Sequence, residues 1–182
     1  METKRVVTMP DVQEALTPFY IKTSQVFYLS LVGGVLVFFV IDLWLYLQTS
    51  DLSLAANIEL VRLLSFTHLF YALAGYPVSL YLFERLFTRK HVHGVPAMTP
   101  DGILIAIRLA SVVRLAIMEG IAFLGLVICF IGAQSGILHR FPEYWLNSLS
   151  SIILIGFVVF DFPTRERLER ICRTRVFTAS EV

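Results

Sequence analysis

One carboxyl side chain stands out for the chemistry it could perform. Glu119 lies among apolar and small residues, in a stretch long enough to cross a bilayer. An ionisable group at such a depth is costly in hydrocarbon and therefore marks a candidate functional site. The nearest cation, Arg114, precedes it by five residues, which on a helix is a rotation of about 140° and a rise of about 7.5 Å, so the two side chains leave different faces. We expect Glu119 to find a donor on another helix or subunit, or to stay protonated, and in doing so either to hold a neighbouring helix or to carry an ion.

A second candidate is His68, the one histidine that falls within an apolar stretch of this kind. It could relay a proton with Glu119 or ligate haem. A bis-histidine haem needs a second such residue, and the remaining histidines, at 91, 93 and 139, fall in connecting segments. His91 and His93 form an H-x-H pair with only Asp101 as a nearby acid, which is a weak metal signal. We therefore expect a hydrogen-bonded packing role for His68, and no metal, cofactor or catalytic set.

Residues 116–127 read AIMEGIAFLGLV. This segment resembles the carboxyl-terminal helix of ATP synthase subunit c, which typically carries A-x-x-E-x-x-A-x-x-G-L-V. The resemblance covers about a dozen residues, and it implies that Glu119 binds a transported proton or sodium ion. The rest of the chain departs from that family, because the preceding apolar segment is not rich in glycine and the loop before 116–127 lacks R-Q-P. The resemblance implies a proteolipid-like carboxylate, without predicting an ATP synthase rotor.

Two further patterns indicate surfaces for packing or docking. Small residues recur at three- and four-residue spacing after Glu119, an arrangement that lets helix backbones approach closely, within this chain or against another: Ala122, Gly125, Cys129 and Gly132. From Pro163 the tail reads PTRERLERICRTRV, which predicts an amphipathic helix. Its arginines would lie near anionic lipid headgroups or dock onto a partner, and those assigned to this role are Arg167, Arg170 and Arg173.

The elements that must position these residues are four apolar segments, each about 20 residues long, as a helix needs to cross about 30 Å of hydrocarbon. They cover residues 26–47, 61–83, 113–133 and 144–162. The third helix should begin earlier, at Pro100-Asp101-Gly102, and Gly75 with Pro77 predicts a kink in the second. The predicted fold is all-α, a polytopic integral membrane protein with four transmembrane helices.

Lys and Arg are unevenly distributed between the connecting segments. Eleven fall in the amino-terminal segment, the middle loop and the tail, whereas the other two loops contain only Arg62 and Arg140. The positive-inside rule therefore predicts that both termini are cytoplasmic. The predicted domains are a cytoplasmic segment at 1–25, a membrane domain at 26–162 and a basic tail at 163–182. The expected location is the plasma membrane, specifically a bacterial inner membrane. Cys129 and Cys172 fall in different environments, so we expect no disulfide between them.

Composition narrows the class of function. The chain of 182 residues is 57% hydrophobic and only 16% charged, against about a quarter charged in soluble domains, and it shows no basic face typical of nucleic-acid binding. It also lacks a nucleophile–base, metal or phosphate-loop motif. The favoured function is a non-catalytic membrane subunit or assembly factor of a larger complex. The alternatives are a proton- or ion-translocating protein acting through Glu119, and an enzyme with a site built from Glu119, Arg114 and His68, which no motif supports. Expected partners are membrane lipids with anionic headgroups, other membrane subunits or further copies of the chain.

Overall fold

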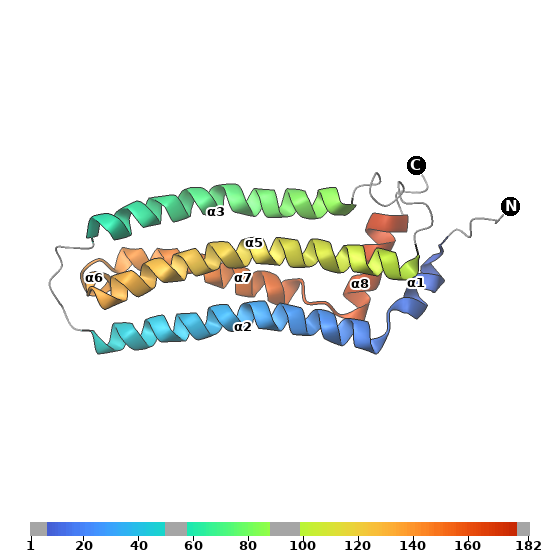
Figure 1. Cartoon of the computed structure of the whole chain (residues 1–182), viewed down its shortest axis with the longest axis horizontal. Helices are drawn as coiled ribbons and strands as arrows, with labels where there is room; N and C mark the ends of the chain where they lie inside the picture. The colour runs from blue at the N-terminus through green and yellow to red at the C-terminus, as the bar shows by residue number, and fades with distance from the viewer. Residues whose placement is uncertain (1–6, 50–57, 88–98, 178–182) are drawn as a thin grey trace.

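The computed structural model describes residues 7–49, 58–87 and 99–177, and all regular elements in these ranges are helical (Figure 1). Four stretches are long and apolar enough to cross a membrane, which confirms the predicted number. Three are the single helices α2 (Pro18–Gln48), α3 (Ile58–Phe87) and α5 (Pro100–Gln134). The fourth joins the 3₁₀ helix η1 (Pro142–Ser148) to α7 (Leu149–Phe160). The shorter elements are α1 (Met9–Ala15), α6 (Ile137–Arg140), α8 (Arg165–Ile171) and the π-helical turn η2 (Cys172–Phe177).

Threonines start several of these helices. Thr17 accepts a hydrogen bond from the amide of Tyr20, and Thr99 accepts one from Gly102, each with a proline at the first helical position. Thr164 caps α8 in the same way. A threonine oxygen satisfies an amide that the helix cannot, and a proline there loses no hydrogen bond. The predicted start of the third helix at Pro100 is thereby confirmed.

The centre of the fold is α5. It packs against α2, α3 and α7, whereas α2 and α3 lie on opposite sides of it (Figure 1). Helix α3 lies close to α5 at Gly75, where an added Cβ would be 2.7 Å from the Ile121 side chain. Gly75 thus allows α3 to approach α5, and α3 continues as one helix through Pro77. The predicted kink there stays a prediction.

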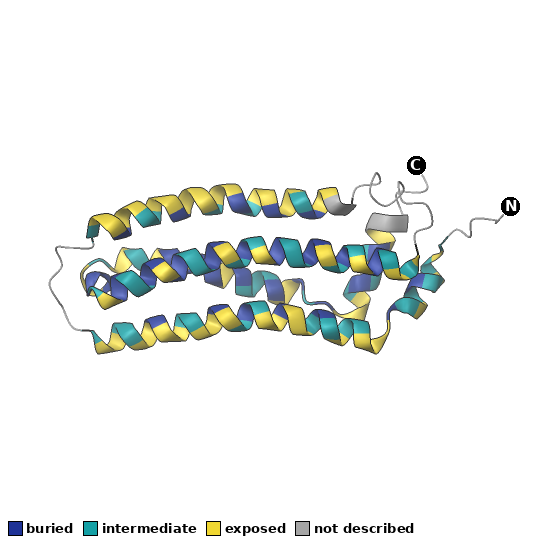
Figure 2. Ribbon diagram, viewed as in Figure 1, coloured by how far each residue is buried: buried dark blue, intermediate teal, exposed yellow. Residues whose placement is uncertain are grey.

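Burial follows this arrangement. Buried and half-buried residues line α5 along most of its length, while α2 and α3 expose their outer faces (Figure 2). Those outer faces carry large apolar side chains such as Val37 and Phe70, which are 63% and 70% exposed. The apolar residues are therefore distributed as they would be in a protein whose outer surface meets a non-aqueous medium.

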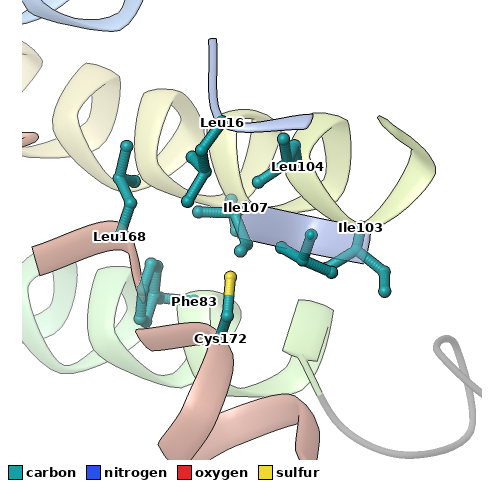
Figure 3. Close-up of a cluster of buried hydrophobic side chains, with 9 residues drawn as sticks. Leu16, Phe83, Ile103, Leu104, Ile107, Leu168 and Cys172 are labelled. Carbon is teal, nitrogen blue, oxygen red and sulfur yellow. The ribbon is translucent and has the colours of Figure 1, made fainter. Parts of the chain in front are cut away.

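A compact cluster joins both terminal segments to the first turns of α5. Figure 3 shows Leu16 at the end of α1, Leu168 of α8 and Cys172 of η2 converging on Ile107 and its neighbours. Leu168 and Cys172 are almost fully buried. The predicted helix after Pro163 is thus present, and its apolar face packs within the chain. We call the end of the bundle that carries α1, α8 and the start of α5 the terminal end.

The fourth spanning element differs from the sequence prediction in its local geometry. Residues 144–162 were expected to form one α-helix, but the segment starts with the 3₁₀ turns of η1 and only α7 is α-helical. A 3₁₀ helix rises about 2 Å per residue, so η1 and α7 together still reach about 32 Å. The backbone carbonyl of Asn147 in η1 lies against α5, and the tighter winding brings the neighbouring polar side chains toward α3.

Candidate functional site

Glu119 lies midway along α5, half-buried at the edge of an outward-facing strip. Ala116 and Gly120, three residues before it and one after, are exposed. One turn further on, Phe123 reaches Gly34 of α2, with 3.4 Å between the Phe123 ring and a Cβ placed on the glycine. Glu119 therefore borders the α2 contact on one side and the open strip on the other. Within the described ranges its carboxyl group has no recorded hydrogen bond or ion pair.

Arg114 is not available to Glu119, as helical geometry predicted. Its guanidinium forms a buried ion pair with Asp161, the residue that ends α7. It is also held between two aromatic rings, 3.8 Å from the centroid of Phe83 and 4.4 Å from that of Phe157. Arg167 of α8 bonds the second oxygen of Asp161. Asp161 thus links α5, α7 and α8.

The three tail arginines assigned to docking have different surroundings. Arg167 points to Asp161 and is 38% exposed in its side chain, whereas Arg170 and Arg173 are exposed. Arg170 and Arg173 therefore lie on the surface of the tail. Arg167 instead ties the tail to the bundle.

His68 belongs to a polar network between α3 and η1. Its Nδ1 lies 3.0 Å from Oδ1 of Asn147, and Nδ2 of Asn147 donates to Ser65 Oγ and to the Tyr144 carbonyl, both at 2.9 Å. Since the amide nitrogen of Asn147 is used as a donor, its oxygen is the acceptor and His68 Nδ1 must carry the proton. Nε2 of His68 is buried and has no hydrogen-bond partner in the described structure.

This network lines a cleft of about 680 Å³ between α3 and the η1–α7 segment. Most of its wall is apolar, and it includes Leu69, Leu73 and Ile153. The polar residues Ser65, His68 and Asn147 also line it. The volume falls within the range of about 300–1,000 Å³ that is usual for small-molecule sites.

The small residues that follow Glu119 are all buried and serve contacts within the chain. A Cβ on Gly125 would lie 2.1 Å from the Asn147 carbonyl oxygen, and one on Gly132 would lie 3.1 Å from Leu138. Cys129 donates its thiol to the Tyr144 carbonyl at 3.7 Å, and Ala122 packs in the core shared with α2 and α7. In the described structure these four residues contact other elements of the same chain.

Asp42 and the two cysteines are further buried groups that could take part in chemistry. Asp42 of α2 is fully buried, and neither carboxyl oxygen has a hydrogen-bond partner among the described residues. Both cysteines are free thiols, and burial, with a smaller contribution from the Glu169 charge, raises the pKa of Cys172 to about 11. In the described ranges no three His, Cys, Asp or Glu residues gather as metal ligands. His91 and His93 lie outside those ranges.

Glu119, His68 and Arg114 therefore occupy three separate places rather than one site. His68 contacts Gly125, about 120° around α5 and about 9 Å along it from Glu119, while Arg114 lies toward the terminal end. Sequence reasoning missed Asn147 and Ser65 as partners of His68, although the i to i+3 spacing of Ser65 and His68 puts both on one face of a helix. No protein-family model matches the chain, and neither does any curated protein or solved structure in the comparisons made.

Proposed function

We propose that the chain is a non-catalytic integral membrane subunit whose outward strip on α5 receives a helix of a partner polypeptide. The observation that carries this proposal is the half-exposed carboxyl of Glu119 beside Ala116 and Gly120. A carboxyl on a lipid-facing surface is costly, whereas a helix packed there can donate a hydrogen bond to it. Small residues four positions apart are the pattern that lets two helices approach closely in a membrane.

The contrast between the two small-residue rows supports an external partner. The row that begins at Ala122 is covered by the chain's own elements, but Ala116 and Gly120 stay exposed. On α2, a Cβ added to Gly33 would meet nothing within 4 Å. The chain thus offers small side chains near an unpartnered acid on its outside, which suits a docking surface better than a lipid-facing one.

Co-purification in mild detergent tests this proposal. The wild-type protein should retain a partner in fixed ratio, detected by mass spectrometry, and Ala116→Leu should lose it because the larger side chain holds the partner helix away. Gly156→Leu is the control, since Gly156 belongs to α7 rather than α5 and a Cβ there would meet nothing within 4 Å. The proposal fails when the wild type extracts alone as a monomer, or when the two variants retain partners equally.

The same carboxyl also favours a second candidate, a proton- or ion-carrying function. A carboxyl group that has no cation beside it in the described structure can bind a proton and release it again if a partner covers the group. Glu119→Gln keeps the shape and hydrogen-bonding capacity but cannot release a proton. If Glu119 carries an ion, this variant should assemble normally and lose proton-linked flux, and a carbodiimide should label wild-type Glu119. Normal flux in the assembled Gln variant rules out ion transport and leaves the docking role.

We further propose that the terminal end faces the cytoplasm of a bacterial inner membrane. The Lys and Arg distribution supports this orientation, and Arg170 and Arg173, exposed at this end, would contact anionic headgroups. Reporter fusions after residues 48, 90, 140 and 182 should read outside, inside, outside and inside. Any other order contradicts the topology.

A further inference from the structure

The cleft between α3 and η1–α7 opens toward the outside of the bundle. Helix α3 contacts η1 but shares no extended interface with α7. Three large apolar side chains of the cleft wall, those of Phe66, Leu73 and Leu149, are exposed. All three belong to elements that are long and apolar enough to cross a membrane. In a bilayer the cleft is therefore open to lipid, so a lipid molecule can enter it from the side.

The cleft is long enough to hold an acyl chain. Its lining on α3 extends from Arg62 to Pro77, which is about 22 Å along a helix that rises 1.5 Å per residue. The hydrocarbon of a bilayer is about 30 Å thick, so one leaflet contributes about 15 Å. The cleft thus covers at least the depth of one leaflet.

The polar groups inside the cleft are already used within the chain. The side-chain amide of Asn147 donates to Ser65 and to the Tyr144 carbonyl. Ser150 Oγ donates to the Asn147 carbonyl at 3.0 Å, and Tyr76 donates to the Ser150 carbonyl at 3.5 Å. The interior therefore favours an apolar chain, and recognition of a polar head group depends on the residues at the end of the cleft.

Two residues of opposite charge line one end of the cleft. They are Arg62, one turn into α3, and Glu143, near the start of η1. Helix α3 and the η1–α7 segment both run from this end of the bundle toward the terminal end (Figure 1). We call the part of the cleft between Arg62 and Glu143 its mouth. The opposite charges at the mouth complement a zwitterion better than an anion or a cation.

Both charged side chains are available to a ligand. Arg62 and Glu143 are exposed, and Arg62 has an ion pair with Glu59 at 3.5 Å on the surface. Such an exposed pair contributes little free energy, so Arg62 can turn toward a ligand. A guanidinium binds a phosphate through two N–H groups, and a carboxylate accepts hydrogen bonds from an ammonium group.

We propose that this cleft binds a zwitterionic phospholipid with an ammonium head, as in phosphatidylethanolamine. One acyl chain lies between α3 and α7, the phosphate contacts Arg62 and the ammonium group contacts Glu143. An anionic phospholipid such as phosphatidylglycerol has no cation to place against Glu143. This proposal does not depend on the docking strip of α5, so the failure of either leaves the other untouched.

Photolabelling of the full-length protein in a nonionic detergent tests the proposal, because the micelle then contains no competing phospholipid. The probe is phosphatidylethanolamine with a diazirine in one acyl chain. The competitors are unlabelled phosphatidylethanolamine and phosphatidylglycerol with the same chains. Label should appear on peptides covering residues 62–77 and 143–153. Phosphatidylethanolamine should compete about two- to fivefold better than phosphatidylglycerol, as expected for an exposed charged contact.

Charge variants test the head-group contacts. Glu143→Gln should keep the labelling but make the two lipids compete equally. Arg62→Gln should weaken competition by both lipids about two- to fivefold, since both contain the phosphate. Arg140→Gln is the matched control, because Arg140 is an exposed arginine near this end of the bundle that does not line the cleft.

Two tryptophan variants test the position of the acyl chain. Leu69 and Leu63 are both exposed leucines of α3, but only Leu69 lines the cleft. Leu69→Trp should lower the labelling of both peptides several-fold, whereas Leu63→Trp should leave it unchanged.

Several results would overturn the proposal. They are equal labelling of the two folded tryptophan variants, equal competition by the two lipids on the wild type, and a lipid preference that survives Glu143→Gln. Label spread evenly over all the long helices would indicate contact with bulk lipid only. A polypeptide crosslinked at residues 62–77 and 143–153 would identify the cleft as a protein interface instead.

Discussion

Removing one partner of the buried ion pair between Arg114 and Asp161 should cost more stability than removing one partner of an exposed ion pair such as Arg62 with Glu59. The Arg114 and Asp161 side chains are only 7% exposed, and the Arg114 guanidinium lies between Phe83 and Phe157. Asp161→Asn keeps the shape of the side chain but removes its charge. Arg114 would then be a buried cation without its counter-ion.

Breaking a buried pair by removing one partner costs about 3–5 kcal/mol, most of it from the charge left behind. Arg167 provides the contrast, because its side chain is 38% exposed and Arg167→Gln should cost about 1 kcal/mol or less. Adding Arg114→Met to Asp161→Asn removes the stranded charge. The double variant should therefore be less destabilised than the sum of the two single variants, and by more than about 1 kcal/mol.

The free energy of unfolding can be measured by titrating mixed micelles with a denaturing detergent and following helicity. Wild type, the three single variants and the double variant form one series. The reasoning is refuted if Asp161→Asn costs less than about 1 kcal/mol, if Arg167→Gln costs as much, or if the two core substitutions are additive.

Three further predictions follow from contacts elsewhere. Gly125→Ala should lower the free energy of unfolding by about 1–3 kcal/mol, because its Cβ would lie 2.1 Å from a backbone oxygen of η1; Gly156→Ala, with open space at the same atom, should be neutral or stabilising by up to about 1 kcal/mol. The Cys172 thiol, with its pKa raised to about 11, should react with iodoacetamide at pH 8 only after unfolding. An unfolded thiol ionises near pH 8.5, so the contribution of the buried Cys172 thiol to the free energy of unfolding should be complete below about that pH. It should be lost as the pH rises toward 11. Replacing Arg170 with Gln should weaken binding to anionic vesicles by about 1 kcal/mol at most, without changing unfolding, and an unchanged vesicle affinity would contradict the headgroup role.

The number of long helices and the start of α5 could be predicted because both depend on local sequence. An apolar run of sufficient length specifies a spanning helix, and Thr99 followed by Pro100 specifies where a helix begins. Which helix packs against which others could not be predicted from the local sequence. Hydrophobicity alone does not distinguish α5 as the helix that contacts the other long segments, since α2 is equally hydrophobic.

The polar contacts were even less accessible from sequence. Asp161 pairs with a residue 47 positions away, and His68 with one 79 positions away. Asn147 lies near the start of an apolar segment, where a single Asn is typical of a loop. Its hydrogen bonds to His68 and Ser65 of α3 form only in the folded structure, where it belongs to the 3₁₀ helix η1. Glu119, in contrast, could be recognised from the sequence because its surroundings on its own helix are apolar, although the side of the bundle that it faces could not.

The central position of α5 has a consequence for how the protein is made. During synthesis α2 and α3 emerge before α5, and in the described structure they share no extended interface. Each of them would therefore stay a separate helix until α5 emerges, and His68 of α3 would lack its partner until Asn147 of η1 follows. The α1 segment waits longer, because its partners Leu168 and Cys172 come after α7 in the sequence. A ribosome stalled before α5 would therefore leave α2 and α3 without the helix that joins them in the folded structure.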